Sequence, residues 1–129
     1  MIIQRSQTEV RLTLNEADTV YASHTSVWEI VIKKALGKLS APDDLEQALI
    51  ATGFGQLPIT LAHILAVGEL PLDTHKDPFD RLLVVQAKVE GLTLITRDTH
   101  LGMYEWHGLK QKVVNSTRVM TVCGVILTE

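Results

Sequence analysis

"THKDPFDRLLVVQA", residues 74–87, places two aspartates at the entrance of a strongly apolar segment. Asp77 is followed directly by a proline, which is typical of a helix N-cap with proline at the first helical position. Asp80 then falls at the third helical position, where an acid meets the positive end of the helix dipole. The pattern predicts a helix that begins at Asp77, runs to about Glu90 and stops at Gly91.

Capping explains Asp77 better than it explains Asp80. The Asp80 carboxylate shares a helical face with the apolar residues three, four and seven positions further along, Leu83, Val84 and Ala87. A carboxylate aligned with the stripe that enters the core needs a cation or a metal ion as its partner. Taken alone, the segment favours capping over chemistry, because perturbed acids are also common in structural networks.

Strands and helices alternate along the rest of the chain. Helices are expected at 5–17 (weakly), 24–39, 41–53 and 60–70, and extended segments at 19–23, 54–59, 92–96, 110–114 and 118–127. This alternation predicts an α/β fold with a mostly parallel central sheet flanked by helices. In such sheets ligands bind beyond the carboxyl ends of the strands, which is where candidate chemistry should be sought.

The helix over 24–39 is expected to be amphipathic and to end at Gly37. Six of its side chains are expected to form one apolar side: Val27, Trp28, Val31, Ile32, Ala35 and Leu36. The helix over 41–53 is expected to start near Pro42, and the helix over 60–70 to be capped by Thr60.

Composition places the chain among single globular domains, residues 1–129, with 46% hydrophobic and 21% charged residues. We expect no membrane segment, because no apolar run reaches the length of a span. One cysteine, Cys123, excludes an intrachain disulfide framework and favours a reducing, cytoplasmic location. The net charge of −3 means that any contact with nucleic acid needs a local basic patch.

Two further acids are expected near the carboxyl ends of strands. Asp98 follows the strand at 92–96, and Glu29 lies in the second turn of the helix after the strand at 19–23. A helix-cap or turn role for Asp98 and a surface pair between Glu29 and Lys33 are the simpler explanations. Three acids from separate elements at one sheet edge nevertheless form a ligand set that suits Mg²⁺ or Mn²⁺.

Other site types have little support. The histidines form no metal-binding spacing, so core or surface roles are expected for them. The chain has no glycine-rich phosphate loop and no nucleophile elbow, and this argues against a nucleotide-binding protein and against a small-molecule α/β hydrolase.

Four motifs in order, "YASHTSVWEIVIKKALGKL", "LPIT", "HKDPFDRLLVVQA" and "LTLITRD", resemble those of PIN-domain ribonucleases, and of VapC-like toxins of bacterial toxin–antitoxin pairs in particular. The resemblance covers about residues 5–114 and implies a PIN-like three-layer fold. It implies a metal-dependent endoribonuclease whose catalytic and metal-binding acids correspond to Glu29, Asp80 and Asp98, with Asp77 as the cap. It also implies an RNA substrate, a homodimer and a cognate antitoxin protein.

The chain departs from this family at its first strand, which in the family is central, ends in an aspartate and leads into a helix. The chain opens instead with "MIIQRSQTEV", which resembles the family segment that comes after that helix. The chain is then a shortened form of a longer product, an inactive relative, or a protein in which another segment fills the place. The apolar extension 115–129 is a candidate, because its "VILTE" ends in Glu129. An edge strand or a dimer contact is the simpler role for it.

The predicted reaction is metal-assisted hydrolysis of an RNA phosphodiester. Arg81 and Arg97 are predicted to contact phosphate, although either could instead neutralise the adjacent acid. The alternative function is a catalytically inactive PIN-like binding module that dimerises or binds an antitoxin.

Overall fold

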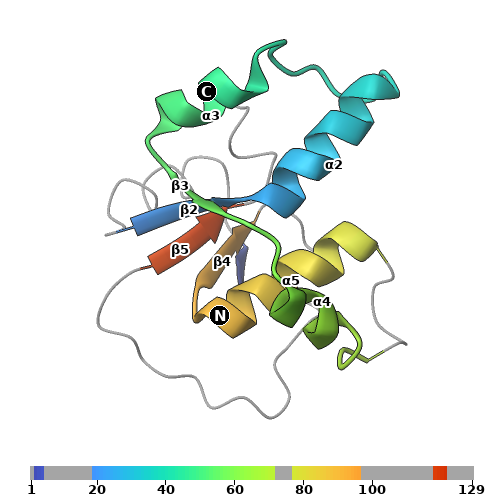
Figure 1. Cartoon of the computed structure of the whole chain (residues 1–129), viewed down its shortest axis with the longest axis vertical. Coiled ribbons are helices and arrows are strands. Elements are labelled where there is room, and N and C mark those ends of the chain that lie inside the picture. The colour runs from blue at the N-terminus through green and yellow to red at the C-terminus, as the bar shows by residue number, and fades with distance from the viewer. Residues whose placement is uncertain (1, 5–18, 72–76, 97–117, 122–129) are drawn as a thin grey trace.

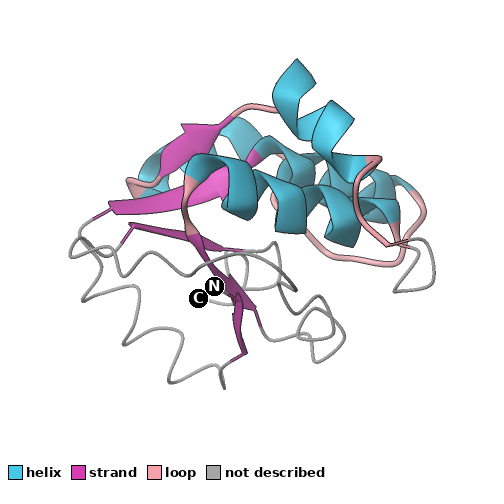
Figure 2. Cartoon of the chain, turned by 90° about the horizontal axis from the view of Figure 1, so that it is seen from below, coloured by secondary structure: helices cyan, strands magenta, loops and turns pink. Residues whose placement is uncertain are grey.

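The computed structural model describes residues 2–4, 19–71, 77–96 and 118–121. The strands are β1 (Ile2–Gln4), β2 (Thr19–Ser23), β3 (Gly55–Leu57), β4 (Thr93–Thr96) and β5 (Arg118–Thr121). The helices are α2 (His24–Ala35), α3 (Leu45–Thr52), α4 (Leu61–Val67) and α5 (Pro78–Glu90). Figure 2 shows the strands in magenta and the helices in cyan alongside them.

All of the strand pairs among the described residues are parallel, and these strands lie in the order β1-β4-β5-β2-β3 (Figure 1). The predicted mixed α/β fold with a parallel sheet flanked by helices is therefore confirmed. The central strand is β5, since Val119 is in register with Val20 of β2 on one side and Thr93 of β4 on the other. The C-terminal extension thus contributes a central strand rather than the edge strand of the simpler expectation. Glu129 lies outside the described residues.

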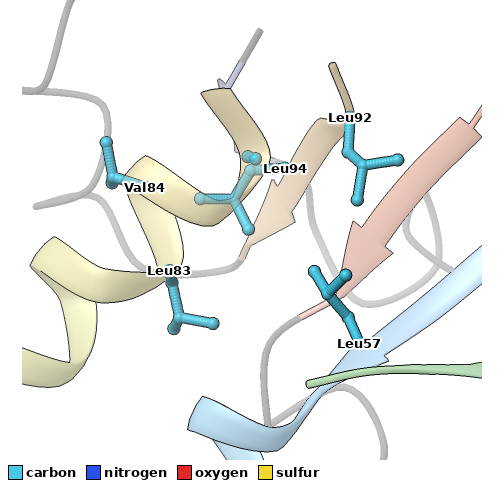
Figure 3. Close-up of a cluster of buried hydrophobic side chains, with 6 residues drawn as sticks. Leu57, Leu83, Val84, Leu92 and Leu94 are labelled. Carbon is cyan, nitrogen blue, oxygen red and sulfur yellow. The ribbon is translucent and has the colours of Figure 1, made fainter. Parts of the chain in front are cut away.

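The core lies between α5 and the strands. It is a cluster of buried apolar side chains (Figure 3): Leu57, Leu83, Val84, Ala87, Leu92 and Leu94. Tyr21 packs against this cluster, whereas its neighbour Ala22 packs with Leu49 of α3. Successive side chains of a strand point to opposite faces, so α5 and α3 cover opposite faces of the sheet at β2.

Helix α5 begins and ends as its sequence predicts. An Asp77 carboxylate oxygen accepts hydrogen bonds from the backbone N–H groups of Phe79 (2.9 Å) and Asp80 (3.1 Å). Gly91 ends the helix with a φ of 65°, a left-handed conformation that glycine adopts without strain. Because these signals are local, the sequence predicts them without knowledge of the tertiary fold.

Two other helix starts differ in how well they match the prediction. Thr60 caps α4 as expected, and its hydroxyl accepts from the His63 N–H. Helix α3 begins later than expected, at Leu45, because Asp44 is its N-cap and accepts from the Gln47 N–H at 3.1 Å. The proline before this point lies outside the helix.

The predicted inward side of α2 is only partly right, since Val27 packs against Ala22 and Leu49 as expected. Trp28, Val31 and Leu36 are exposed, and the residues that are buried are Thr25, Ser26, Glu29 and Ile30. The reason is a tertiary hydrogen bond, because the Thr25 hydroxyl donates to Gln86 of α5 at 2.9 Å and turns this polar side of α2 inward. Gly37 follows the helix with a φ of 72°, and the C-cap itself is Leu36.

Strand β1 was not expected from the sequence. Its three residues pair with β4, with Ile2 opposite Leu94. The helix expected at 5–17 and the extended segment expected at 110–114 lie outside the described residues. Among the helices that the structure describes, none is long and apolar enough to cross a membrane.

Candidate functional site

Glu29 is buried although it belongs to an ion pair with a surface lysine. The residue is 6% exposed, and its carboxylate lies 2.9 Å from the ammonium of Lys33, one helical turn further along. The pair with Lys33 is confirmed, and the acid also faces inward; its role as a metal ligand stays a prediction. A buried carboxylate needs such compensation, since its removal from water is costly.

Asp80 occupies the first turn of α5 and is 9% exposed. Its neighbours on the same helical face, Leu83, Val84 and Ala87, are almost completely buried, as the spacing predicts. The N-cap of α5 is Asp77, and Asp80 lies three positions further on, in the first turn beside the positive end of the helix dipole.

The helical turns that carry these two acids lie side by side. Trp28, which precedes Glu29, meets Phe79, which precedes Asp80, with ring centroids 4.7 Å apart and ring planes at 75°. Edge-to-face contact of this kind is a favoured aromatic geometry. The structure thus brings together the parts of α2 and α5 from which two of the three predicted acids come.

A buried polar cluster joins the start of α2 to the middle of α5. The Ser23 hydroxyl donates to the side-chain oxygen of Gln86, and the Thr25 hydroxyl donates to the same oxygen at 2.9 Å. The Ser23 oxygen also accepts from the Thr25 N–H at 3.0 Å, as the N-cap of α2. All three residues are buried, and all of these donors have acceptors.

The same cluster continues to α4 and to the edge of the core. His63, which is fully buried, accepts at Nδ1 from the Thr60 N–H at 3.1 Å. Its Nε2 therefore carries the proton and donates to a Glu90 carboxylate oxygen 2.8 Å away. The core or surface role expected for His63 is confirmed by its burial in the core, but the sequence did not lead to Gln86. A lone amide inside the apolar run of α5 is the signal that could have identified it.

Arg81 is a buried cap. Its guanidinium donates to the backbone carbonyls of Pro71 (2.9 Å), Leu70 (3.2 Å) and Val67 (3.3 Å), and the residue is 8% exposed. The carbonyls at the end of α4 and in the turn after it are thereby satisfied. Phosphate binding by Arg81 stays a prediction.

The remaining predicted site residues, Arg97, Asp98 and Glu129, lie outside the described residues. Strand β4 ends at Thr96, so Asp98 follows its carboxyl end by two positions. Within the described ranges, no group of three histidine, cysteine or acidic side chains could hold a metal ion. Glu29 and Asp80 are two members of the predicted set.

The donor chemistry at Glu29 and Asp80 fits a divalent metal ion. Carboxylate oxygens are the ligands that Mg²⁺ and Mn²⁺ prefer. In the same part of the molecule, one turn before Glu29, the Ser26 hydroxyl is buried and has no hydrogen-bond partner among the described residues. Such a group calls for an explanation, and a bound ion or its water would supply one.

Comparison with protein families identifies the fold. The model of the PIN domain matches residues 4–105, a range that includes Glu29, Asp80 and Asp98. The chain therefore belongs to the PIN-domain family, a family of nucleases whose members typically bind divalent metal ions. No curated protein and no solved structure matches the chain.

Proposed function

We propose that this protein is a metal-dependent endoribonuclease of the VapC-like toxin type. Asp80, Glu29 and Asp98 are the proposed ligands of a Mg²⁺ or Mn²⁺ ion. The observation that carries the proposal is the burial of Glu29 and Asp80 on adjacent turns of α2 and α5. Two carboxylates held away from water by facing helices favour a divalent cation in a way that solvated surface acids do not.

Each residue has a defined part in this site. When bound, the metal ion supplies an activated water and a positive charge for the phosphate. Glu29 and Asp80 hold their oxygens inside the fold, and Lys33 offsets part of the charge of Glu29. The start of α5 adds the positive end of a helix dipole beside Asp80. Arg97 is the proposed contact of an RNA phosphate, because Arg81 is engaged with backbone carbonyls.

One observation favours an inactive binding module as a second candidate. The resemblance implies that the central strand ends in an aspartate, but β5 is Arg118–Thr121 and contains no acid. A site without that fourth carboxylate would hold a metal ion less tightly. In this second candidate function, the fold binds a partner protein and does not cleave RNA.

Helix α4 supports the proposal of a protein partner. Leu61, Ile64 and Leu65 are 69%, 55% and 66% exposed, and they lie three and four positions apart on one helical face. Grouped apolar residues on a surface mark sites of protein association. We place the contact of the proposed homodimer on this face, and the site of an antitoxin is left to experiment.

The test is titration of the purified chain with Mn²⁺ by calorimetry, followed by cleavage of RNA with and without the metal ion. Asp80→Asn should abolish saturable binding and cleavage. Asp77→Asn is the matched control, because asparagine caps a helix as well as aspartate does and the same charge is removed three positions away. Binding by the wild type and by Asp77→Asn alone supports the nuclease. If the wild type does not bind Mn²⁺, the nuclease is excluded and the inactive binding module is the remaining candidate.

A further inference from the structure

Gln86 is the residue through which α5 holds the start of α2. It is completely buried in the middle of α5, where a side-chain amide is tolerated only if its polar atoms are satisfied. Its oxygen accepts from the hydroxyls of Ser23 and Thr25, which belong to the end of β2 and the first turn of α2. Its nitrogen donates to the Pro58 carbonyl at 3.5 Å and lies 3.4 Å from His63 Nδ1.

The orientation of this amide is fixed by its neighbours. A reversed amide would turn its oxygen towards the Pro58 carbonyl and His63 Nδ1, both of which are acceptors. In the observed orientation the amide oxygen instead accepts from the hydroxyls of Ser23 and Thr25. The observed orientation faces the Pro58 carbonyl with a donor and the two hydroxyls with an acceptor, so the amide ties the first turn of α2 to α5.

The two helices are thereby held at two separate places. One is the bond between Gln86 and Thr25, and the other is the ring contact between Phe79 and Trp28. Along α5 the distance from Gln86 to Phe79 is about 10 Å, at a rise of about 1.5 Å per residue. Two contacts that far apart fix the direction of α2 as well as its position. Glu29 directly follows Trp28, the α2 residue of the second contact.

We infer that Gln86 is a positioning residue, which holds Glu29 in register with the turn of α5 that carries Asp80 by hydrogen-bonding Ser23 and Thr25. The inference rests on the proposed function, because it concerns the same pair of acids. Gln86 would contact neither metal ion nor RNA. Its effect would reach the site through the angle of α2, in the way that groups outside the ligand set commonly orient metal ligands.

The experiment is calorimetric titration of the full chain with Mn²⁺, using variants that separate positioning from stability. Gln86→Leu removes the amide, and Thr25→Val removes one hydroxyl at nearly constant shape. Thr25→Ser keeps that hydroxyl and should rescue binding. Val85→Ala is the control, because Val85 is completely buried on α5 and its truncation loosens the core without touching the polar cluster. Thermal unfolding of each variant identifies a temperature at which all of them are folded, and the titrations are carried out at that temperature.

Positioning predicts that Gln86→Leu and Thr25→Val weaken Mn²⁺ binding about tenfold, at the lower end of the losses known for groups that orient metal ligands. Thr25→Ser and Val85→Ala should stay within about twofold of the wild type. If Gln86→Leu does not fold, the comparison of Thr25→Val with Thr25→Ser decides: only Thr25→Val should weaken Mn²⁺ binding. Equal binding by all variants, or equal weakening by Val85→Ala, overturns the inference and leaves the proposed function intact. A wild type that does not bind Mn²⁺ overturns both.

Discussion

Trp28 and Phe79 meet edge to face with ring centroids 4.7 Å apart, and each directly precedes a buried acid. We expect Phe79→Leu to lower the free energy of unfolding by about 1 kcal/mol, because edge-to-face pairs contribute about 0.5–1.5 kcal/mol beyond their buried area. Trp28→Phe keeps an aromatic ring and should cost less. Urea denaturation of both variants measures this, and unchanged stability in Phe79→Leu would contradict it.

Arg81 is expected to stabilise the fold by satisfying carbonyls at the end of α4. Arg81→Met keeps the apolar stem but removes the guanidinium donor from the carbonyls of Val67, Leu70 and Pro71. The loss should be about 2–4 kcal/mol, since a hydrogen bond to a charged group contributes about 1.5–3 kcal/mol. Arg81→Lys should recover only part of it, because an ammonium does not reproduce the guanidinium fork.

The midpoint of urea unfolding measures the effect of the Arg81 variants. If the residue served phosphate binding alone, Arg81→Met would unfold like the wild type and lose only affinity for RNA. That result would contradict the capping role.

Gly55 is required where β3 passes the ring of Tyr21. A Cβ atom at Gly55 would lie 2.9 and 3.0 Å from two carbon atoms of that ring, which packs against the core. We expect Gly55→Ala to destabilise the protein by about 1–3 kcal/mol, as overpacking does. Gly68→Ala is the matched control, because Gly68 has a helical φ of −65° and its added Cβ would meet only the Leu65 carbonyl at 3.4 Å.

Thermal unfolding of the two glycine variants distinguishes a steric clash from a general effect of alanine. The control should unfold at the temperature of the wild type or slightly above it. Tyr21→Leu should remove most of the additional cost of Gly55→Ala in the double variant, because the ring is then absent. Additive losses in that double variant would show that the ring is not the cause.

Sequence reasoning succeeded where the signals are local. The N-cap at Asp77, the stop at Gly91 and the burial of Asp80 beside Leu83 follow from spacing along one helix, and the structure has them all. The pair between Glu29 and Lys33 follows from spacing too, whereas the burial of Glu29 is seen only in the structure. Of the three predicted acids, Asp80 could thus be placed before any tertiary contact was known.

The errors concern contacts between distant segments. Apolar residues occur on more than one side of α2, so its inward side is decided by Gln86, 61 residues from Thr25. The central position of β5 is likewise a matter of which strands it pairs with, and a short apolar run does not specify its neighbours. Gln86 was not predicted, because the role of one amide in an apolar helix depends on hydrogen-bond partners that lie in other segments of the chain.

The exposed face of α4 leads to a prediction about assembly. If Leu61, Ile64 and Leu65 form the contact of a homodimer, Leu65→Glu places a charge in an apolar interface and should convert the protein to a monomer. The fold should tolerate the change, because Leu65 is 66% exposed and exposed substitutions usually shift stability by less than about 0.5 kcal/mol. Sedimentation equilibrium gives the mass of each form.

Ile50→Glu is the control for that measurement, because Ile50 is 55% exposed on a different helix, α3. A dimeric wild type and a dimeric Ile50→Glu, beside a monomeric Leu65→Glu, would assign the contact to α4. If the wild type is monomeric, or if Leu65→Glu stays dimeric, this face does not form the dimer. Retained Mn²⁺ binding in monomeric Leu65→Glu would further show that one chain holds the metal ion without its partner.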